Sequence, residues 1–225
     1  MLLTLAVAAL AFLQTPATSA KIVFNFEEGK SQPAAYTLEI SEDGAGHFRS
    51  TAGPVPSPVS EDGIAPGAVD QDIRINEPLL SHFFSVARAN HYFAVECEIG
   101  HGKIAFTGKK TFTYSGSEGH GSCTYNYSRI QALNQIASEM IAVANTLEIG
   151  RRLTIEHEHS RLALDGELEA LEEAAKGGRA LEIENIASTL QSIANDETVL
   201  LRARRRAAEL INASSSKSQN SATKH

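Results

Sequence analysis

The chain lacks tryptophan, has only two cysteines among its 225 residues and shows no excess of positive charge. Aromatic residues make up only 6%, so a carbohydrate platform of stacked aromatic rings is not expected. The formal net charge of -7 argues against a nucleic-acid-binding role, which needs a basic surface. Beyond the first residues no apolar run reaches about 18 residues, so we expect no later membrane span.

Motifs of known catalytic chemistry are also missing from the sequence. No Gly-Lys-Ser/Thr ending follows a glycine-rich loop, and no Gly-x-Ser-x-Gly pattern occurs. The one thiol with a nearby base is Cys123 beside His120, and this pairing would be excluded if Cys123 formed a disulfide. We therefore predict no catalytic residue and no cofactor, and favour a protein that is not an enzyme. The alternative left open is an enzyme that uses polar residues of the loops.

The first twenty residues predict a secretory signal peptide. An apolar run extends from Leu2 to Leu13, Pro16 follows, and small residues lead to Ala20. This run is too short to span a bilayer. We expect the mature protein to begin near Lys21 and to be periplasmic or secreted, with an uncleaved anchor as the alternative.

The two cysteines, Cys97 and Cys123, each fall on the apolar side of an alternating pattern. In an oxidising compartment two such cysteines most simply form one disulfide. The alternative is a pair of buried free thiols.

Residues 21–128 have the period of two that is typical of half-buried strands. Asp43-Gly44 predicts a tight turn, and Asn76-Glu77-Pro78 predicts the start of one helix capped by Asn76. We expect an antiparallel sheet with this single helix packed on it. The alternating apolar positions lie in segments that include 22–26, 36–40, 93–99, 104–106, 112–114 and 123–127.

Residues 129–212 change to a helical period. An apolar stripe runs from Ile130 to Leu147 at steps of three and four residues, and similar stripes follow to Leu210. Gly150 is a candidate interruption of the first helix. We predict an α+β fold in which an antiparallel helical hairpin or small bundle follows the sheet. The Ser-, Lys- and Asn-rich tail, 213–225, is expected to be disordered.

Two polar clusters are candidate sites in the helical part. His157 and His159 could ligate a metal, but two residues apart they face different sides of a helix, and structural or surface roles are favoured. Arg202, Arg204, Arg205 and Arg206 could contact an anionic surface. The alternative is a solvated helix face whose arginines pair with Glu197 and Glu209.

Three segments resemble uncharacterised exported proteins of environmental, acidobacteria-like bacteria. They are KIAFTGKKTFTYSG, GSCTYNYS and TLEIGRRLTIEHEHSRLALDGEL, within residues 103–168. The resemblance implies a bacterial, exported protein, and it brings no activity and no site residues with it.

Together these patterns favour an exported, non-enzymatic protein. The first hypothesis is interaction with an envelope protein, or self-association, through the helical region. The alternative is a module of the cell envelope that binds a metal or a small ligand.

Overall fold

The computed structural model describes residues 19–55, 64–98 and 104–222. The predicted signal peptide lies outside the described residues apart from Ser19 and Ala20. No helix in the described part of the chain has the length and apolar character needed to cross a membrane.

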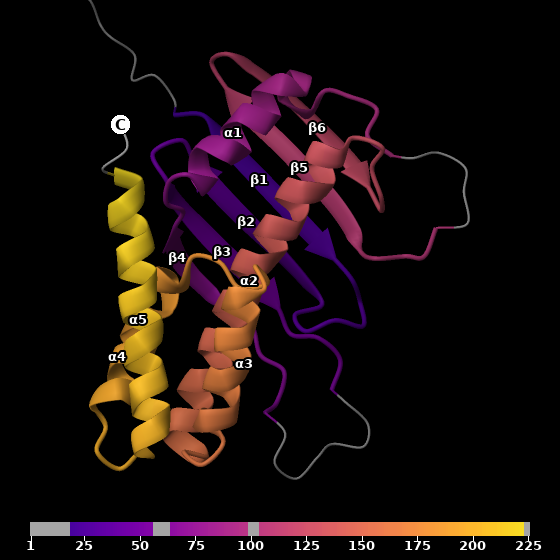
Figure 1. The fold of residues 1–225 in the computed structure, drawn as a ribbon. Helices are drawn as coiled ribbons and strands as arrows, with labels where there is room; N and C mark the ends of the chain where they lie inside the picture. Colours follow the sequence, from indigo (N-terminus) through magenta and orange to yellow (C-terminus); the bar gives the residue numbers. More distant parts are fainter. Residues whose placement is uncertain (1–18, 56–63, 99–103, 223–225) are drawn as a thin grey trace, which may run out of the picture.

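Six antiparallel strands form one sheet in the order β4-β3-β2-β1-β5-β6 (Figure 1). β1 is central and pairs with β2 on one side and β5 on the other. The predicted turn at Asp43 and Gly44 joins β2 to β3, and Gly44 has a φ of 84°, a conformation that glycine adopts without strain. The strands are Lys21–Glu27 (β1), Ala35–Ser41 (β2), Ala45–Thr51 (β3), Asp70–Arg74 (β4), Lys109–Gly116 (β5) and Gly119–Tyr125 (β6).

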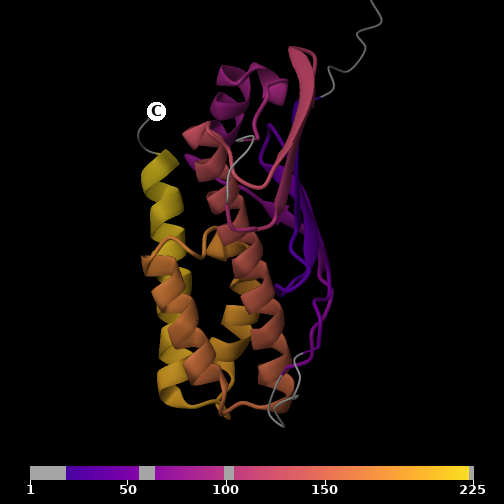
Figure 2. The same ribbon diagram turned by 90° about the vertical axis from the view of Figure 1, so that its right-hand side faces the viewer.

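The helices gather on one face of this sheet, as Figure 2 shows. α1 and the first part of α2 pack over the sheet, and α3, α4 and α5 surround the rest of α2. The helices are Leu79–Ala89 (α1), Gln131–His159 (α2), Leu164–Lys176 (α3), Ala187–Asn195 (α4) and Leu201–Ala222 (α5), with short 3-10 turns at His91–Phe93 (η1) and Ile183–Ile186 (η2).

One hydrophobic cluster runs from the inner face of the sheet into the helices. Phe24 and Leu38 of the central strands and Met140 of α2 are fully buried within it. The period-two pattern correctly identified the inward positions of these strands, and the predicted α+β class is confirmed.

Two predicted strands are absent from the described residues. Phe93 lies in η1, and the segment that follows it packs on the core-facing side of β6, where Cys97 bonds to Cys123. Among the described residues this segment forms only a single bridge, between Glu98 and Ser128. The alternation of apolar residues in this segment arises because every second side chain faces the core. The described part of the segment does not pair with a neighbouring strand through a ladder of hydrogen bonds. Ile104 and Phe106 lie in an irregular segment and are 39% and 64% exposed, so the prediction of a half-buried strand there was wrong.

Three helical details also differ from the sequence prediction. α2 is a single helix of 29 residues that continues through Gly150. α5 extends to Ala222, so most of the tail that was expected to be disordered is helical. α1 starts after Pro78 and has no side-chain cap. Asn76, the predicted cap, instead contacts a residue of the linker between α3 and η2, as described below.

Candidate functional site

The predicted disulfide is confirmed. Cys97 and Cys123 are bonded, with their Cα atoms 6.1 Å apart, inside the usual range. Both residues are buried, and the bond ties the segment after η1 to β6. Cys123 is therefore not a free nucleophile, and His120 lies at an exposed position of β6.

The histidines at the end of α2 have different partners. His157 Nε2 lies 2.9 Å from Asp196 Oδ2 in the α4–α5 turn. His159 is largely exposed and lies 3.7 Å from Glu158. In the part of the chain that the structure describes, no three His, Cys, Asp or Glu side chains are placed to hold a metal. His157 instead joins the end of α2 to the α4–α5 turn.

Three of the four arginines of α5 contact neighbouring helices. Arg202 and Arg206 pair with Asp165 of α3, at 2.6 and 3.6 Å. Arg204 donates to the main-chain oxygen of Ala194. Arg205 is exposed and forms no ion pair with the described residues. The expected pairing with Glu197 and Glu209 is replaced by pairing with α3 because the two helices pack together.

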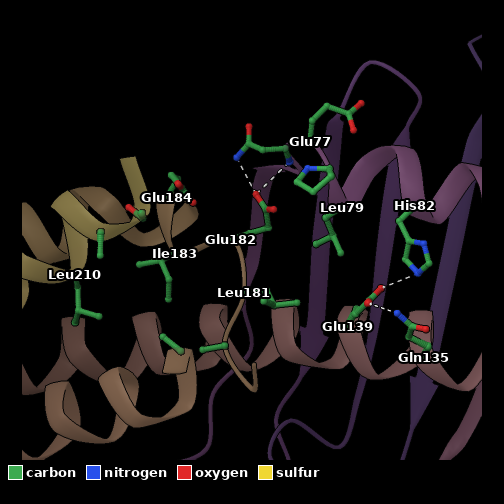
Figure 3. Close-up of a pocket in the computed structure, with 16 residues that line it drawn as sticks. Glu77, Leu79, His82, Gln135, Glu139, Leu181, Glu182, Ile183, Glu184 and Leu210 are labelled. Atoms are coloured by element: carbon green, nitrogen blue, oxygen red, sulfur yellow. Dashed lines mark hydrogen bonds and ion pairs between the residues drawn. The ribbon is translucent and has the colours of Figure 1, made fainter. Parts of the chain in front are cut away.

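A cleft of about 450 Å³ lies between α1, α2, α5 and the linker that leads into η2 (Figure 3). This volume is within the range of small-molecule sites. Its apolar surface comes mainly from Leu79, Leu181, Ile183 and Leu210. Its ionisable side chains are Glu77, His82, Glu139, Glu182 and Glu184.

The linker reaches the cleft because α3 ends sharply. Gly178 has a φ of 68°, and the amide of Arg179 donates to the oxygen of Ala174, which closes the helix end. Two hydrogen bonds then hold the linker on α2: Asn145 Nδ2 donates to Arg179 O, and Thr146 Oγ1 donates to Leu181 O. Leu181 and Glu182 are thereby fixed opposite the start of α1.

Glu182 occupies an unusual position in this linker. Its φ is 55°, a left-handed conformation that disfavours a residue with a side chain. Its Oε2 accepts hydrogen bonds from both the main-chain N and the Nδ2 of Asn76, at 3.1 and 2.8 Å. Burial raises the pKa of Glu182 to about 7, and the nearby Glu184 adds to this, while the bonds from Asn76 oppose it.

A second polar group lies on the opposite wall of the cleft. Glu139 of α2 accepts a hydrogen bond from Gln135 Nε2 at 3.0 Å, and its Oε2 lies 3.6 Å from Nε2 of His82 on α1. Figure 3 shows Leu79 and Leu181 between this group and Glu182, whereas Ile183 and Leu210 lie on the other side of Glu182. The arrangement combines apolar surface for burying a ligand with carboxylate acceptors for orienting it.

Sequence reasoning did not identify this cleft. Asn76 and Glu182 are 106 residues apart, and each lies in a segment whose own pattern indicates only a helix start or a connection. The one local signal is Asn76-Glu77-Pro78, and on its own this pattern predicts only the start of a helix capped by Asn76.

Comparison with models of known protein families and with curated proteins found no match for this chain.

Proposed function

We propose that this chain is an exported binding protein that holds a small ligand in the cleft between α1, α2, α5 and the linker, without performing chemistry on it. The observation that carries the proposal is the combination, in one cavity of about 450 Å³, of apolar side chains with Glu139 and Glu182. Ligand sites in proteins are typically apolar pockets with a few convergent polar groups, and carboxyl groups of shifted pKa cluster at functional sites.

The exported location is supported by two features. Residues 2–20 have the pattern of a signal peptide. The Cys97–Cys123 disulfide is of a kind that persists mainly in oxidising compartments. The signal-peptide pattern and the disulfide are both consistent with a protein of the cell envelope that binds a small ligand.

A fragment screen by ligand-observed NMR tests the proposal. Leu79 is half-buried at the cleft, and Leu79→Trp would fill part of the cavity. Leu201 is 57% exposed outside the cleft, so Leu201→Trp is the matched control. We expect fragments to bind the wild type and the control and to lose binding to Leu79→Trp. Equal binding to all three proteins would refute the proposal.

Self-association through the helical region is a second candidate function. Leu162, Leu200 and Leu201 are 80%, 42% and 57% exposed. Leu162 lies in the α2–α3 turn, Leu200 lies in the α4–α5 turn and Leu201 begins α5. His157 and Arg161 join these turns by contacting Asp196. Exposed apolar side chains that gather on one surface are typical of interaction sites.

Sedimentation velocity over a range of concentrations tests this candidate. Leu162→Ser combined with Leu201→Ser should abolish any dimer, whereas Phe106→Ser, which alters an exposed side chain elsewhere, should leave it intact. A wild-type protein that stays monomeric at all concentrations would exclude self-association.

A further inference from the structure

We infer that the ligand of the cleft is a cationic amphiphile: an apolar body that carries a protonated amine. This inference rests on the proposed function, because it assigns a ligand class to the same cleft.

The charges that line the cleft are nearly all negative. Four carboxyl groups contribute, those of Glu77, Glu139, Glu182 and Glu184, and the single basic group is the imidazole of His82. No Lys or Arg belongs to the lining among residues 19–55, 64–98 and 104–222. A carboxylate ligand would therefore meet repulsion in a partly desolvated site, where Coulomb interactions are stronger than in water, whereas an ammonium group would be attracted.

Glu182 has acceptor capacity that the protein leaves unused. Both donors of Asn76 bind Oε2, and Oε1 receives no hydrogen bond from any residue that the structure describes. An ionised carboxylate can accept about four hydrogen bonds. An ammonium group has three donors and no acceptor, so it matches Oε1 of Glu182 better than a hydroxyl or carboxyl group does.

The apolar surface lies beside these acceptors. Leu181 and Ile183 flank Glu182 in the linker, and Leu79 faces them from α1 in Figure 3. A chain of methylene groups that starts at an ammonium on Glu182 would be buried against these side chains. Burial of apolar surface would supply most of the affinity, and the ion pair would supply selectivity for charge.

The protonation of Glu182 links binding to pH. Burial places the pKa of this carboxyl at about 7, so near neutral pH a bound ammonium would favour its ionised form and release a proton. Affinity for an amine should therefore rise as the pH increases from about 6 to 8. The other titratable groups that line the cleft are Glu184 in η2, Glu77 just before α1, His82 in α1 and Glu139 on α2. The residues of α3 and α5 that line it are uncharged.

Isothermal titration calorimetry with three probes of equal chain length tests the inference: n-octylammonium, n-octanol and octanoate. We expect octylammonium to bind the wild type about tenfold more tightly than octanol, since a hydrogen bond to a charged group contributes this much. Octanoate should bind most weakly. The affinity of octylammonium should increase with pH, and that of octanol should not.

Two variants show whether the carboxyl group is responsible. Glu182→Gln keeps the acceptor for Asn76 and should remove the preference for octylammonium over octanol. Glu158→Gln, which removes an equal charge from an exposed position of α2, should keep the preference. Unchanged circular dichroism and melting temperature would show that Glu182→Gln is folded.

The outcomes separate the two proposals. If octanol binds as tightly as octylammonium, or octanoate binds best, the inference is wrong and the cleft remains a binding site. If none of the three probes binds, the inference is also wrong, and the fragment screen with Leu79→Trp decides the proposed function independently.

Discussion

The side-chain amide of Asn185 forms two hydrogen bonds with the main chain of Arg74, although the two residues are 111 positions apart. Its Oδ1 accepts from Arg74 N at 2.7 Å, and its Nδ2 donates to Arg74 O at 2.9 Å. Asn185 lies in η2, and Arg74 ends the edge strand β4. The amide thus takes the place of a neighbouring strand at this edge, where unpaired main-chain groups would otherwise remain. It also holds η2 and the adjoining Glu182 against the sheet.

Replacing Asn185 by alanine should destabilise the protein by about 1–3 kcal/mol, because the two hydrogen bonds with Arg74 and a third, from Nδ2 to Glu182 O, are lost. Urea unfolding followed by circular dichroism measures this change. Gln191→Ala is the matched control, since it removes an exposed amide whose bond is local, to Asn195. Equal stability of the two variants would show that the contact with Arg74 contributes nothing.

Gly150→Ala should destabilise the protein even though alanine favours a helix by about 1 kcal/mol over glycine. A Cβ atom at this position would lie only 2.4 Å from Cγ2 of Ile186, so α2 and η2 would have to separate. We expect a net loss of about 1–3 kcal/mol, as is typical of an overpacked core. Thermal unfolding of Gly150→Ala provides the measurement.

A second substitution identifies the cause of that loss. Ile186→Ala removes the Cγ2 atom that a Cβ at position 150 would meet, so Gly150→Ala should cost less stability in the Ile186→Ala background than in the wild type. A Gly150→Ala protein as stable as the wild type would show that the two elements move apart without cost.

The sequence was most informative where a local pattern corresponds to burial on one face. Phe24, Leu38 and Phe112 alternate because each faces the helices from a half-buried strand, and the period of two follows directly. The stripe from Leu133 to Leu147 is likewise the buried side of α2. Patterns of this kind depend on one element and one contact surface, so they can be predicted from sequence.

Features that depend on two distant segments could not be predicted in this way. Gly150 looked like a helix interruption, and it permits the close approach of Ile186. Asn76 looked like a cap, and it binds Glu182. The same holds for the candidate site as a whole, because its walls come from four parts of the chain whose proximity is set by the packing of α1, α2 and α5 around the linker.

Removing the disulfide should lower the stability of the protein. Cys97 and Cys123 are separated by 26 positions, and closing a loop of this size restricts the unfolded chain by an amount equivalent to about 3–4 kcal/mol in the chain-entropy model. We expect Cys97→Ala combined with Cys123→Ala to unfold at a lower urea concentration than the oxidised wild type. Adding a reductant should lower the wild-type midpoint towards that of the variant and leave the variant unchanged. A reductant that shifts both proteins equally would contradict this prediction.

Glu156 should make the protein less stable as the pH rises from about 4.5 to 7. It lies on α2 with 8% of its surface exposed, and its Oε2 has no hydrogen-bond partner among the described residues. Burial raises its pKa from 4.5 to about 7, Glu167 adds to this, and Arg152 opposes it. Between these values the folded carboxyl keeps its proton while the unfolded one loses it, so the free energy of unfolding falls with increasing pH and levels off above 7. The loss is at most about 3 kcal/mol, at roughly 1.4 kcal/mol for each pH unit.

Glu156→Gln isolates this contribution. A neutral amide of similar shape should leave stability nearly unchanged at pH 5 and raise it relative to the wild type at pH 8, as measured by urea unfolding at both pH values. Glu182, whose pKa is also raised to about 7, is present in both proteins, so its effect cancels in the difference. The exposed neighbour Glu158 provides the control, because Glu158→Gln should follow the wild type at each pH. If Glu156→Gln differs from the wild type by the same amount at pH 5 and pH 8, the carboxyl of Glu156 does not keep its proton in the folded protein.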